Sequence, residues 1–200
     1  MADEPRHVHV VLVRHGATDW SEESRHTGWT DISLNADGLR QAAALPAPLS
    51  RLSFDAVYCS PLRRARTTCE LAALADDAEF DADLREWNYG DYEGQTSADI
   101  HRQRPGWSIW EHGVPNGETL AQVAERADRV IARLRAAGGT VAVFAHGHLL
   151  RVLASRWIDQ QPLLAQHLNL YTASVSQLGH EHSRSSITVW NNTEHLRALG

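Results

Sequence analysis

The sequence predicts an α/β protein, a three-layer α/β/α sandwich with a largely parallel central sheet. Short runs rich in β-branched residues that end at glycine or polar residues are typical of buried strands, and they occur at 7–13, 54–60 and 140–145. Segments with helical character lie between and after these runs, at 35–47, 61–75, 118–136 and 149–158. Strands that alternate with helices in this way favour a parallel sheet with a helix layer on each face.

The ends of the predicted helices carry their own signals. Asn35 is a favoured residue before the first helical turn, and Pro46 ends that helix because proline removes a backbone donor. Pro61 suits the first turn of the second helix. The Gly138–Gly139 pair ends the third, which has an apolar stripe along its length.

Residues 84–117 are less regular than the rest of the chain. They carry several tryptophans and glycines, and only one short helix is predicted among them, near 96–103. We expect a loop-rich insertion that lies over the functional site. Alternating segments at 174–181 and 185–191 predict a late hairpin. Because no repeat or linker divides the 200 residues, we expect a single domain over 1–200.

Composition narrows the class of protein. The formal net charge is −6, so neither nucleic acid nor an anionic membrane is an expected partner. Every one of the 19 basic side chains is an arginine, which excludes a lysine Schiff base and a P-loop lysine. Two cysteines argue against a disulfide framework, and no apolar run resembles a signal peptide or a membrane span. We therefore expect a cytoplasmic protein whose oligomeric state stays open, a homo-oligomer included.

The 12 histidines raise the question of a metal site. Neither a His-Glu-x-x-His nor a Cys-x-x-Cys pattern is present. We therefore expect no metal ion and no other cofactor.

Polar side chains follow each of the three predicted parallel strands. Arg14 and His15 come directly after the first strand, residues 60–64 after the second, and His146 after the third. Ligands of parallel sheets bind beyond the carboxyl ends of the strands, so these groups are expected to meet at one edge. Arginine guanidinium groups suit a phosphate dianion, and a histidine beside them can attack phosphorus through a neutral ring nitrogen. Glu86, from the irregular segment, could protonate the leaving oxygen and then activate water.

Four stretches carry a family resemblance. In order along the chain, LVRHGATDW, CSPLRRARTTCELA, LREWNYGDYEG and FAHGHLLR resemble the motifs of the histidine phosphatase superfamily, also called the phosphoglycerate mutase-like superfamily. The resemblance extends from about residue 9 to residue 175. WSEESRHTGWTD and PGWSIWEHGVPNGET are similar to a narrower branch, which includes sedoheptulose-1,7-bisphosphatase and bacterial mutase-like acid phosphatases.

The resemblance implies a role for each of five residues. His15 would become the phosphohistidine, and Arg14 and Arg64 would bind the phosphoryl group. His146 would add a hydrogen-bond donor in the transition state. Glu86 would be the proton donor to the leaving group.

Four further residues have expected positions near the phosphate or in the irregular segment. Ser21 stands where the family has an asparagine that often touches phosphate, and we expect its hydroxyl to bind the phosphate. Arg151 is expected either to face a substrate phosphate or to cap backbone carbonyls. Trp107 and Trp110 are expected to pack a lid rather than to stack on a sugar.

The expected function is that of a metal-independent phosphatase. Its partner would be a small-molecule phosphate ester, a sugar phosphate or bisphosphate among the candidates, hydrolysed through a phosphohistidine. One alternative is a phosphoglycerate mutase, but the segment between Gly94 and Gly113 is short and offers only Arg102 and Arg104 as extra basic groups. A second alternative is a non-catalytic protein that binds phosphorylated ligands, which the intact set of motif residues argues against.

Overall fold

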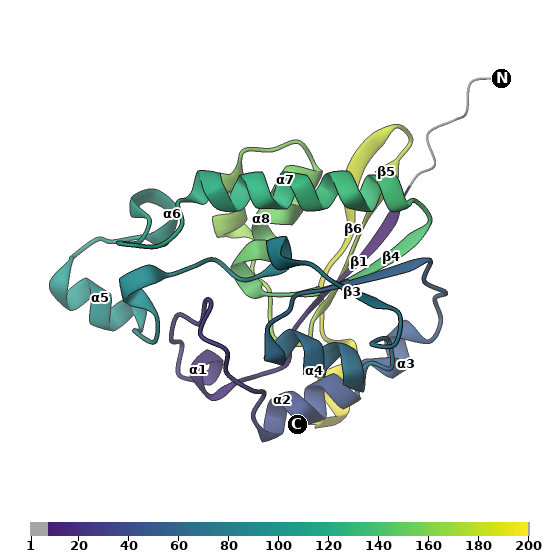
Figure 1. Ribbon diagram of the computed structural model, residues 1–200, viewed down its shortest axis with the longest axis horizontal. Coiled ribbons are helices and arrows are strands. Elements are labelled where there is room, and N and C mark those ends of the chain that lie inside the picture. The colour runs from purple at the N-terminus through teal and green to yellow at the C-terminus, as the bar shows by residue number, and fades with distance from the viewer. Residues whose placement is uncertain (1–7, 200) are drawn as a thin grey trace.

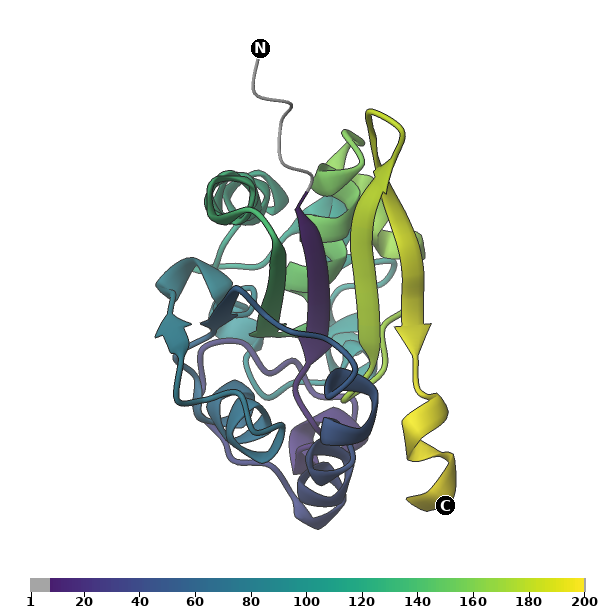
Figure 2. The same cartoon turned by 90° about the vertical axis from the view of Figure 1, so that its right-hand side faces the viewer.

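A six-stranded sheet runs through the centre of the molecule in the order β3-β2-β4-β1-β5-β6, as Figure 2 shows. The computed structural model describes residues 8–199. The four strands β1 to β4 are mutually parallel, whereas β5 is antiparallel to β1 and β6 is antiparallel to β5. The strands are β1 (His9–Arg14), β2 (Ala56–Cys59), β3 (Ala78–Phe80), β4 (Thr140–Ala145), β5 (Val175–Glu181) and β6 (Arg184–Asn192).

Helices cover both faces of this sheet (Figure 1). Because successive side chains of a strand point to opposite faces, Val10 and Leu12 of β1 pack with α7 and α8, whereas Val11 and Val13 pack with α2 and α4. The predicted three-layer α/β/α architecture with a largely parallel sheet is confirmed. The α-helices are α1 (Asp19–Glu22), α2 (Ala36–Ala43), α3 (Pro46–Leu49), α4 (Arg63–Leu71), α5 (Ser97–Gln103), α6 (Ile109–His112), α7 (Leu120–Ala137) and α8 (Gly147–Trp157). The 3₁₀ helices are η1 (Ala82–Leu84), η2 (Gly90–Tyr92), η3 (Pro162–His167) and η4 (Glu194–Leu199).

Several helix ends differ from the prediction; the predicted helix at 61–75, for example, ends at Leu71. Pro61 lies before α4 rather than in its first turn, because Leu62 is the extended residue that precedes the helix. Pro46 does more than end a helix, since it begins α3, where its restricted φ suits the first turn. Helix α8 begins at Gly147, two residues before the predicted start, directly after the extended residue His146. The predicted start at Asn35 is confirmed, because its side chain accepts a hydrogen bond from Gly38 N.

The sequence did not predict β3, α1 or α6. Each of these elements is three or four residues long, too short to show a repeating apolar pattern. The late hairpin and the short helix in the irregular segment are confirmed as β5–β6 and α5. The predicted strand at 7–13 begins with His7, which lies outside the described residues.

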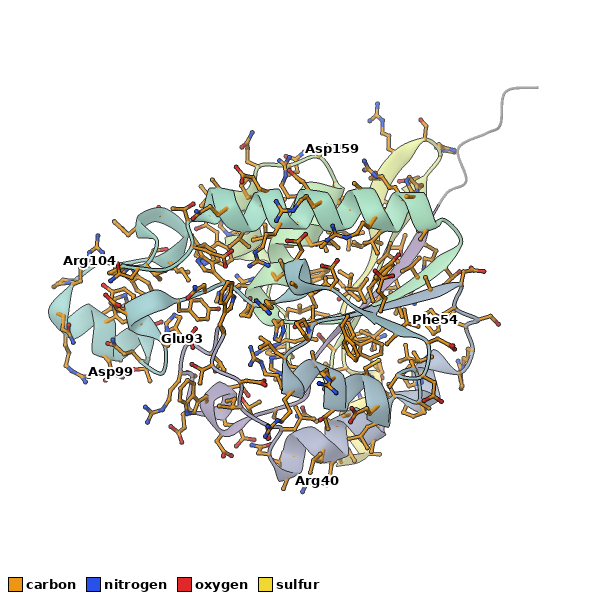
Figure 3. All side chains as sticks on the ribbon, viewed as in Figure 1. Arg40, Phe54, Glu93, Asp99, Arg104 and Asp159 are labelled. Atoms are coloured by element: carbon orange, nitrogen blue, oxygen red, sulfur yellow. The ribbon has the colours of Figure 1, made fainter. Side chains whose placement is uncertain are left out.

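The segment at 84–117 projects beyond the sheet and carries α5 and α6 at one end of the molecule (Figure 1). Glu93, Asp99 and Arg104, which Figure 3 labels, come from this segment. Trp87 and Trp107 are buried in it and join the core cluster that includes α7 and α8. Among residues 8–199, no helix combines the length and the apolar character that crossing a membrane requires.

Candidate active site

The loop after β1 holds His15 at the carboxyl edge of the sheet. His15 N donates to Ala145 O at 3.0 Å, and Ala173 N donates to His15 O at 3.0 Å, so the backbone is fixed on both sides. The ring Nδ1 lies 2.7 Å from Gly16 O. A carbonyl oxygen only accepts, so the ring proton lies on Nδ1 and the lone pair lies on Nε2.

Burial lowers the pKa of the His15 ring well below its ordinary value, and the positive charges of Arg64 and Arg14 lower it further. The ring is therefore neutral at neutral pH. A neutral ring with a free lone pair on Nε2 is a competent nucleophile.

Two glycines let the His15 loop pack directly on helix α2. A Cβ atom on Gly16 would lie 2.4 Å from Gly38 O, and one on Gly38 would lie 2.0 Å from Ala17 O. Ala17 N also donates to the Gln41 side chain at 2.9 Å. The backbone contact between loop and helix thus sets the position of His15.

Arg14, the last residue of β1, has an unsatisfied donor. Its Nη1 donates to Leu170 O at 2.5 Å. Its Nε is buried and makes no hydrogen bond within residues 8–199. A guanidinium group stays protonated at any ordinary pH, so this N–H is available to an anion. The guanidinium group lies against the start of α8, since a Cβ on Gly147 would be in van der Waals contact with Arg14 Nε at 3.4 Å.

Arg64 and His146 form a buried pair next to His15. Arg64 Nε donates to His146 Nδ1 at 3.1 Å, so the ring proton of neutral His146 lies on Nε2, 2.7 Å from Ser60 Oγ. The His15 and His146 rings have centroids 5.1 Å apart. Burial and the neighbouring Arg64 lower the pKa of His146 well below its ordinary value.

The remaining donors of Arg64 are largely occupied by backbone. Nη1 donates to Thr30 O at 3.0 Å, and Nη2 donates to Thr27 O at 3.2 Å and Gly28 O at 2.7 Å. One N–H group on Nη1 is left beyond these contacts. Glu93 holds the same loop from its other side, because its carboxylate accepts from Gly28 N at 3.1 Å. Arg64 is fully buried.

Glu86 caps helix α8 from a distant part of the chain. Its Oε1 accepts from Trp87 N at 2.8 Å and from Leu149 N at 2.9 Å. Among residues 8–199, its Oε2 accepts only from His148 N, at 2.9 Å. The N–H groups of His148 and Leu149 lie in the first turn of α8, where a helix cannot satisfy them internally, so the carboxyl group is held where the helix begins. Oε1 is saturated, and Oε2 is the oxygen that has room for a proton.

A buried ion pair orients the segment that carries Glu86. Arg126 of α7 donates through Nε and Nη2 to the two oxygens of Glu118, at 2.7 and 2.9 Å. The same guanidinium donates to the backbone carbonyls of Asp83, Arg85 and Glu86, at 2.6, 2.9 and 3.3 Å. Arg126 is only 8% exposed, so these contacts are not weakened by solvent.

A cleft of about 250 Å³ opens over His15. Five of the seven predicted site residues line it, namely Arg14, His15, Ser21, Glu86 and Arg151. The other two, Arg64 and His146, are fully buried beside His15 and do not line it. A larger hollow of about 890 Å³ lies at the opposite end of the sheet, beside Val8 and Gly138, and contains none of the seven.

Two further predicted phosphate ligands, Ser21 and Arg151, have partners within the protein, as Arg64 does. The Ser21 hydroxyl donates to Thr18 O at 2.9 Å and accepts from Thr18 N at 2.9 Å, in a capping box at the start of α1. Arg151 donates to Ala165 O and Gln166 O, both at 2.9 Å, and lies over the Trp110 ring at 4.7 Å. Arg151 therefore caps carbonyls, one of its two expected positions, while it also borders the cleft.

Sequence analysis missed several cleft residues. Ser24, Arg25, His26 and Thr27 come from the loop after α1, and Ser97 from the first turn of α5. No periodicity marks the four loop residues, because their backbone is irregular, and Ser97 lies at the very start of a short helix. Trp107 and Trp110 do not line the cleft and pack among aromatic rings, as predicted. Within residues 8–199, no group of three or more His, Cys, Asp or Glu side chains is arranged to hold a metal ion.

A neutral histidine among buried arginines, at the carboxyl edge of a parallel sheet, is typical of enzymes that transfer a phosphoryl group through histidine. The family model of the histidine phosphatase superfamily (branch 1) matches residues 10–193. The chain belongs to this superfamily, and it is a phosphatase.

Known proteins resemble the chain over most of its length. An acid phosphatase of Mycobacterium tuberculosis is 37% identical over 198 residues, which cover 97% of each chain. The sedoheptulose 1,7-bisphosphatase of Saccharomyces cerevisiae is 35% identical over 180 residues, covering 74% of this chain and 66% of that protein. A solved structure from M. tuberculosis has a TM-score of 0.87 at 36% identity and covers 92% of this chain and 97% of its own.

Proposed function

We propose that the chain hydrolyses small phosphate esters in two steps through His15. In the first step, Nε2 of His15 forms a bond to phosphorus while the bond from phosphorus to the ester oxygen breaks. Glu86 gives its proton to the departing oxygen. In the second step, water attacks the phosphohistidine, its proton passes to Glu86, and inorganic phosphate leaves.

One observation carries this proposal. Two consecutive residues of the same cleft carry groups that make no hydrogen bond within residues 8–199. They are the acceptor Nε2 of His15 and the donor N–H on Nε of Arg14. A buried donor without a partner is costly, and an oxyanion would satisfy it. Arg64 adds positive charge from below, and the Nε2–H of His146 would turn from Ser60 to the phosphoryl oxygens. Ser21 and Arg151 would contact the phosphate from the rim.

The arginines also support a metal-independent reaction. Arg14 and Arg64 supply the positive charge that a metal ion supplies to phosphoryl oxygens in other phosphatases. The same cleft favours a small substrate, so we propose phosphorylated metabolites, sugar phosphates and bisphosphates among them. The likeness to a sedoheptulose bisphosphatase supports this range. We further propose a single domain in the cytoplasm, with 84–117 as an insertion over the site.

The test is capture of the intermediate. Wild-type protein mixed with a ³²P-labelled ester and quenched in base should carry label that acid releases, as an N–P bond requires, and the label should map to the peptide that holds His15. His15→Ala should fold, carry no label and keep less than about a tenth of wild-type kcat, a loss above ~1.4 kcal/mol. His101→Ala, a histidine outside the cleft, is the matched control. Label on His15→Ala, or higher residual activity, would refute the assignment.

A further inference from the structure

The wall of the cleft beyond His15 carries polar groups that the two-step reaction does not use. His26 reaches it from the loop after α1, Tyr89 from the 84–117 segment and His148 from the first turn of α8. The hydroxyl groups of Ser24 and Ser97 lie on the same cleft. We call His26, Tyr89, His148, Ser24 and Ser97 the distal wall.

The protonation of His26 is settled by its contacts. Its Nδ1 lies 2.8 Å from Gln95 O, and because a carbonyl only accepts, Nδ1 carries the proton. Burial lowers the pKa of His26, so the ring is neutral at neutral pH. Its other nitrogen, Nε2, therefore holds a lone pair, and it makes no hydrogen bond within residues 8–199.

The His26 ring is also fixed in orientation. It meets the Tyr89 ring edge-on with centroids 5.0 Å apart, and the Trp107 ring with centroids 5.5 Å apart. The ring cannot rotate without breaking the hydrogen bond from Nδ1 to Gln95 O. The distal wall thus presents a pre-oriented acceptor, which has little conformational freedom to lose on binding.

A rigid neutral acceptor selects its ligand by chemistry. A hydroxyl group can donate a hydrogen bond to Nε2. A carboxylate or phosphate oxygen is itself an acceptor, so it would be repelled by the lone pair of the ring. The Tyr89 hydroxyl and His148 Nδ1 are hydrogen-bonded to each other and so are less available. The serine hydroxyls can either donate or accept. Arg25 lines the same cleft, but its guanidinium group donates to Glu23 and to Gly94 O. The wall that His26 forms with the serine hydroxyls therefore suits a neutral, hydroxylated group.

We propose that His26 accepts a hydrogen bond from a hydroxyl group on the carbon chain of the substrate and thereby selects polyhydroxylated phosphate esters over plain alkyl esters. The proposal rests on the proposed function, because it takes the phosphoryl group to lie at His15. A cleft of about 250 Å³ limits the substrate to a phosphoryl group with a short carbon chain.

The test compares sn-glycerol 3-phosphate with n-propyl phosphate, two esters of equal carbon number that differ by two hydroxyl groups. His26→Phe keeps the edge contacts with Tyr89 and Trp107 and removes Nε2. For this variant kcat/KM should fall about tenfold with glycerol phosphate, the contribution of about one hydrogen bond, and by less than about twofold with propyl phosphate. His26→Gln, which restores an acceptor, should lose less than His26→Phe.

His101→Phe is the matched control. His101 also lies against the Trp107 ring, with centroids 6.3 Å apart, and its Nε2 lies 2.7 Å from a backbone carbonyl oxygen, but it does not line the cleft. This variant should leave the ratio of the two kcat/KM values unchanged. If His26→Phe slows both esters equally, or neither, His26 does not select the substrate, although the phosphatase reaction itself stands. If wild-type protein hydrolyses neither ester and no aryl phosphate, the proposed function fails instead.

Discussion

Replacement of Glu86 by glutamine changes one atom and separates two roles of this side chain. Oε1 could remain as the amide oxygen and keep its contacts with Trp87 N and Leu149 N. The amide nitrogen would then face His148 N, which now donates to Oε2 at 2.9 Å. Two donors would oppose each other in a site where the carboxyl is 4% exposed. We expect Glu86→Gln to lower the free energy of unfolding by about 1–3 kcal/mol, the cost of one buried donor without a partner.

The catalytic effect should depend on the leaving group. Alkoxides need a proton as they depart, so kcat for glycerol 3-phosphate should fall about 100-fold or more, in the range of general acid catalysis. A nitrophenolate leaves without protonation, so kcat for p-nitrophenyl phosphate should fall less than about tenfold. Urea unfolding measures the first effect, and steady-state kinetics with both esters measures the second.

Glu118→Gln is the matched control for this experiment. Glu118 is a second, partly buried carboxylate in contact with the same segment, but its oxygens bind Arg126 and Asn88 N, and it does not line the cleft. We expect this variant to be destabilised and to slow both esters by the same factor. Equal slowing of the two esters by Glu86→Gln as well would show that Glu86 is not the general acid.

Four more predictions concern stability and reaction class. Because the pKa values of His15 and His146 are lowered in the folded protein, the unfolded chain binds more protons than the folded one as the pH falls through 6.5. Each histidine should therefore lower the free energy of unfolding by about 1 kcal/mol between pH 6.5 and 5.5. Urea unfolding of the double variant His15→Gln, His146→Gln should lack this loss. Arg126→Met should destabilise the fold by about 3 kcal/mol, because Glu118 loses its buried partner, whereas Arg129→Met, which breaks an exposed ion pair on the same helix, should cost less than about 1 kcal/mol in thermal or urea unfolding. With 3-phosphoglycerate and a bisphosphoglycerate primer, the protein should release phosphate and form little 2-phosphoglycerate; rapid isomerisation would favour a mutase. Excess EDTA should leave the rate of ester hydrolysis unchanged, and a loss that zinc or magnesium restores would contradict the metal-independent reaction.

The sequence alone determined the layers of the fold and the edge at which the site lies. Runs of β-branched residues mark its strands, and the helical spacing of apolar residues marks its longer helices. Both signals are local, so they can be read without knowledge of the tertiary structure. Because parallel strands end at the same edge of a sheet, Arg14, His15 and His146 were expected to meet there. Their motifs pointed to the family because the residues lie in contiguous stretches of sequence.

The tertiary structure alone decided the partners of each side chain. Nothing local indicates that Glu86 caps a helix 62 and 63 residues further on, or that Arg126 binds the carbonyls of the segment before it. Nor does the sequence show that His26 lines a cleft shared with His15, since the hydrogen bond to Gln95 that fixes its tautomer joins residues 69 apart. Such contacts depend on how loops pack against one another, and loops carry no periodic pattern from which their neighbours could be inferred.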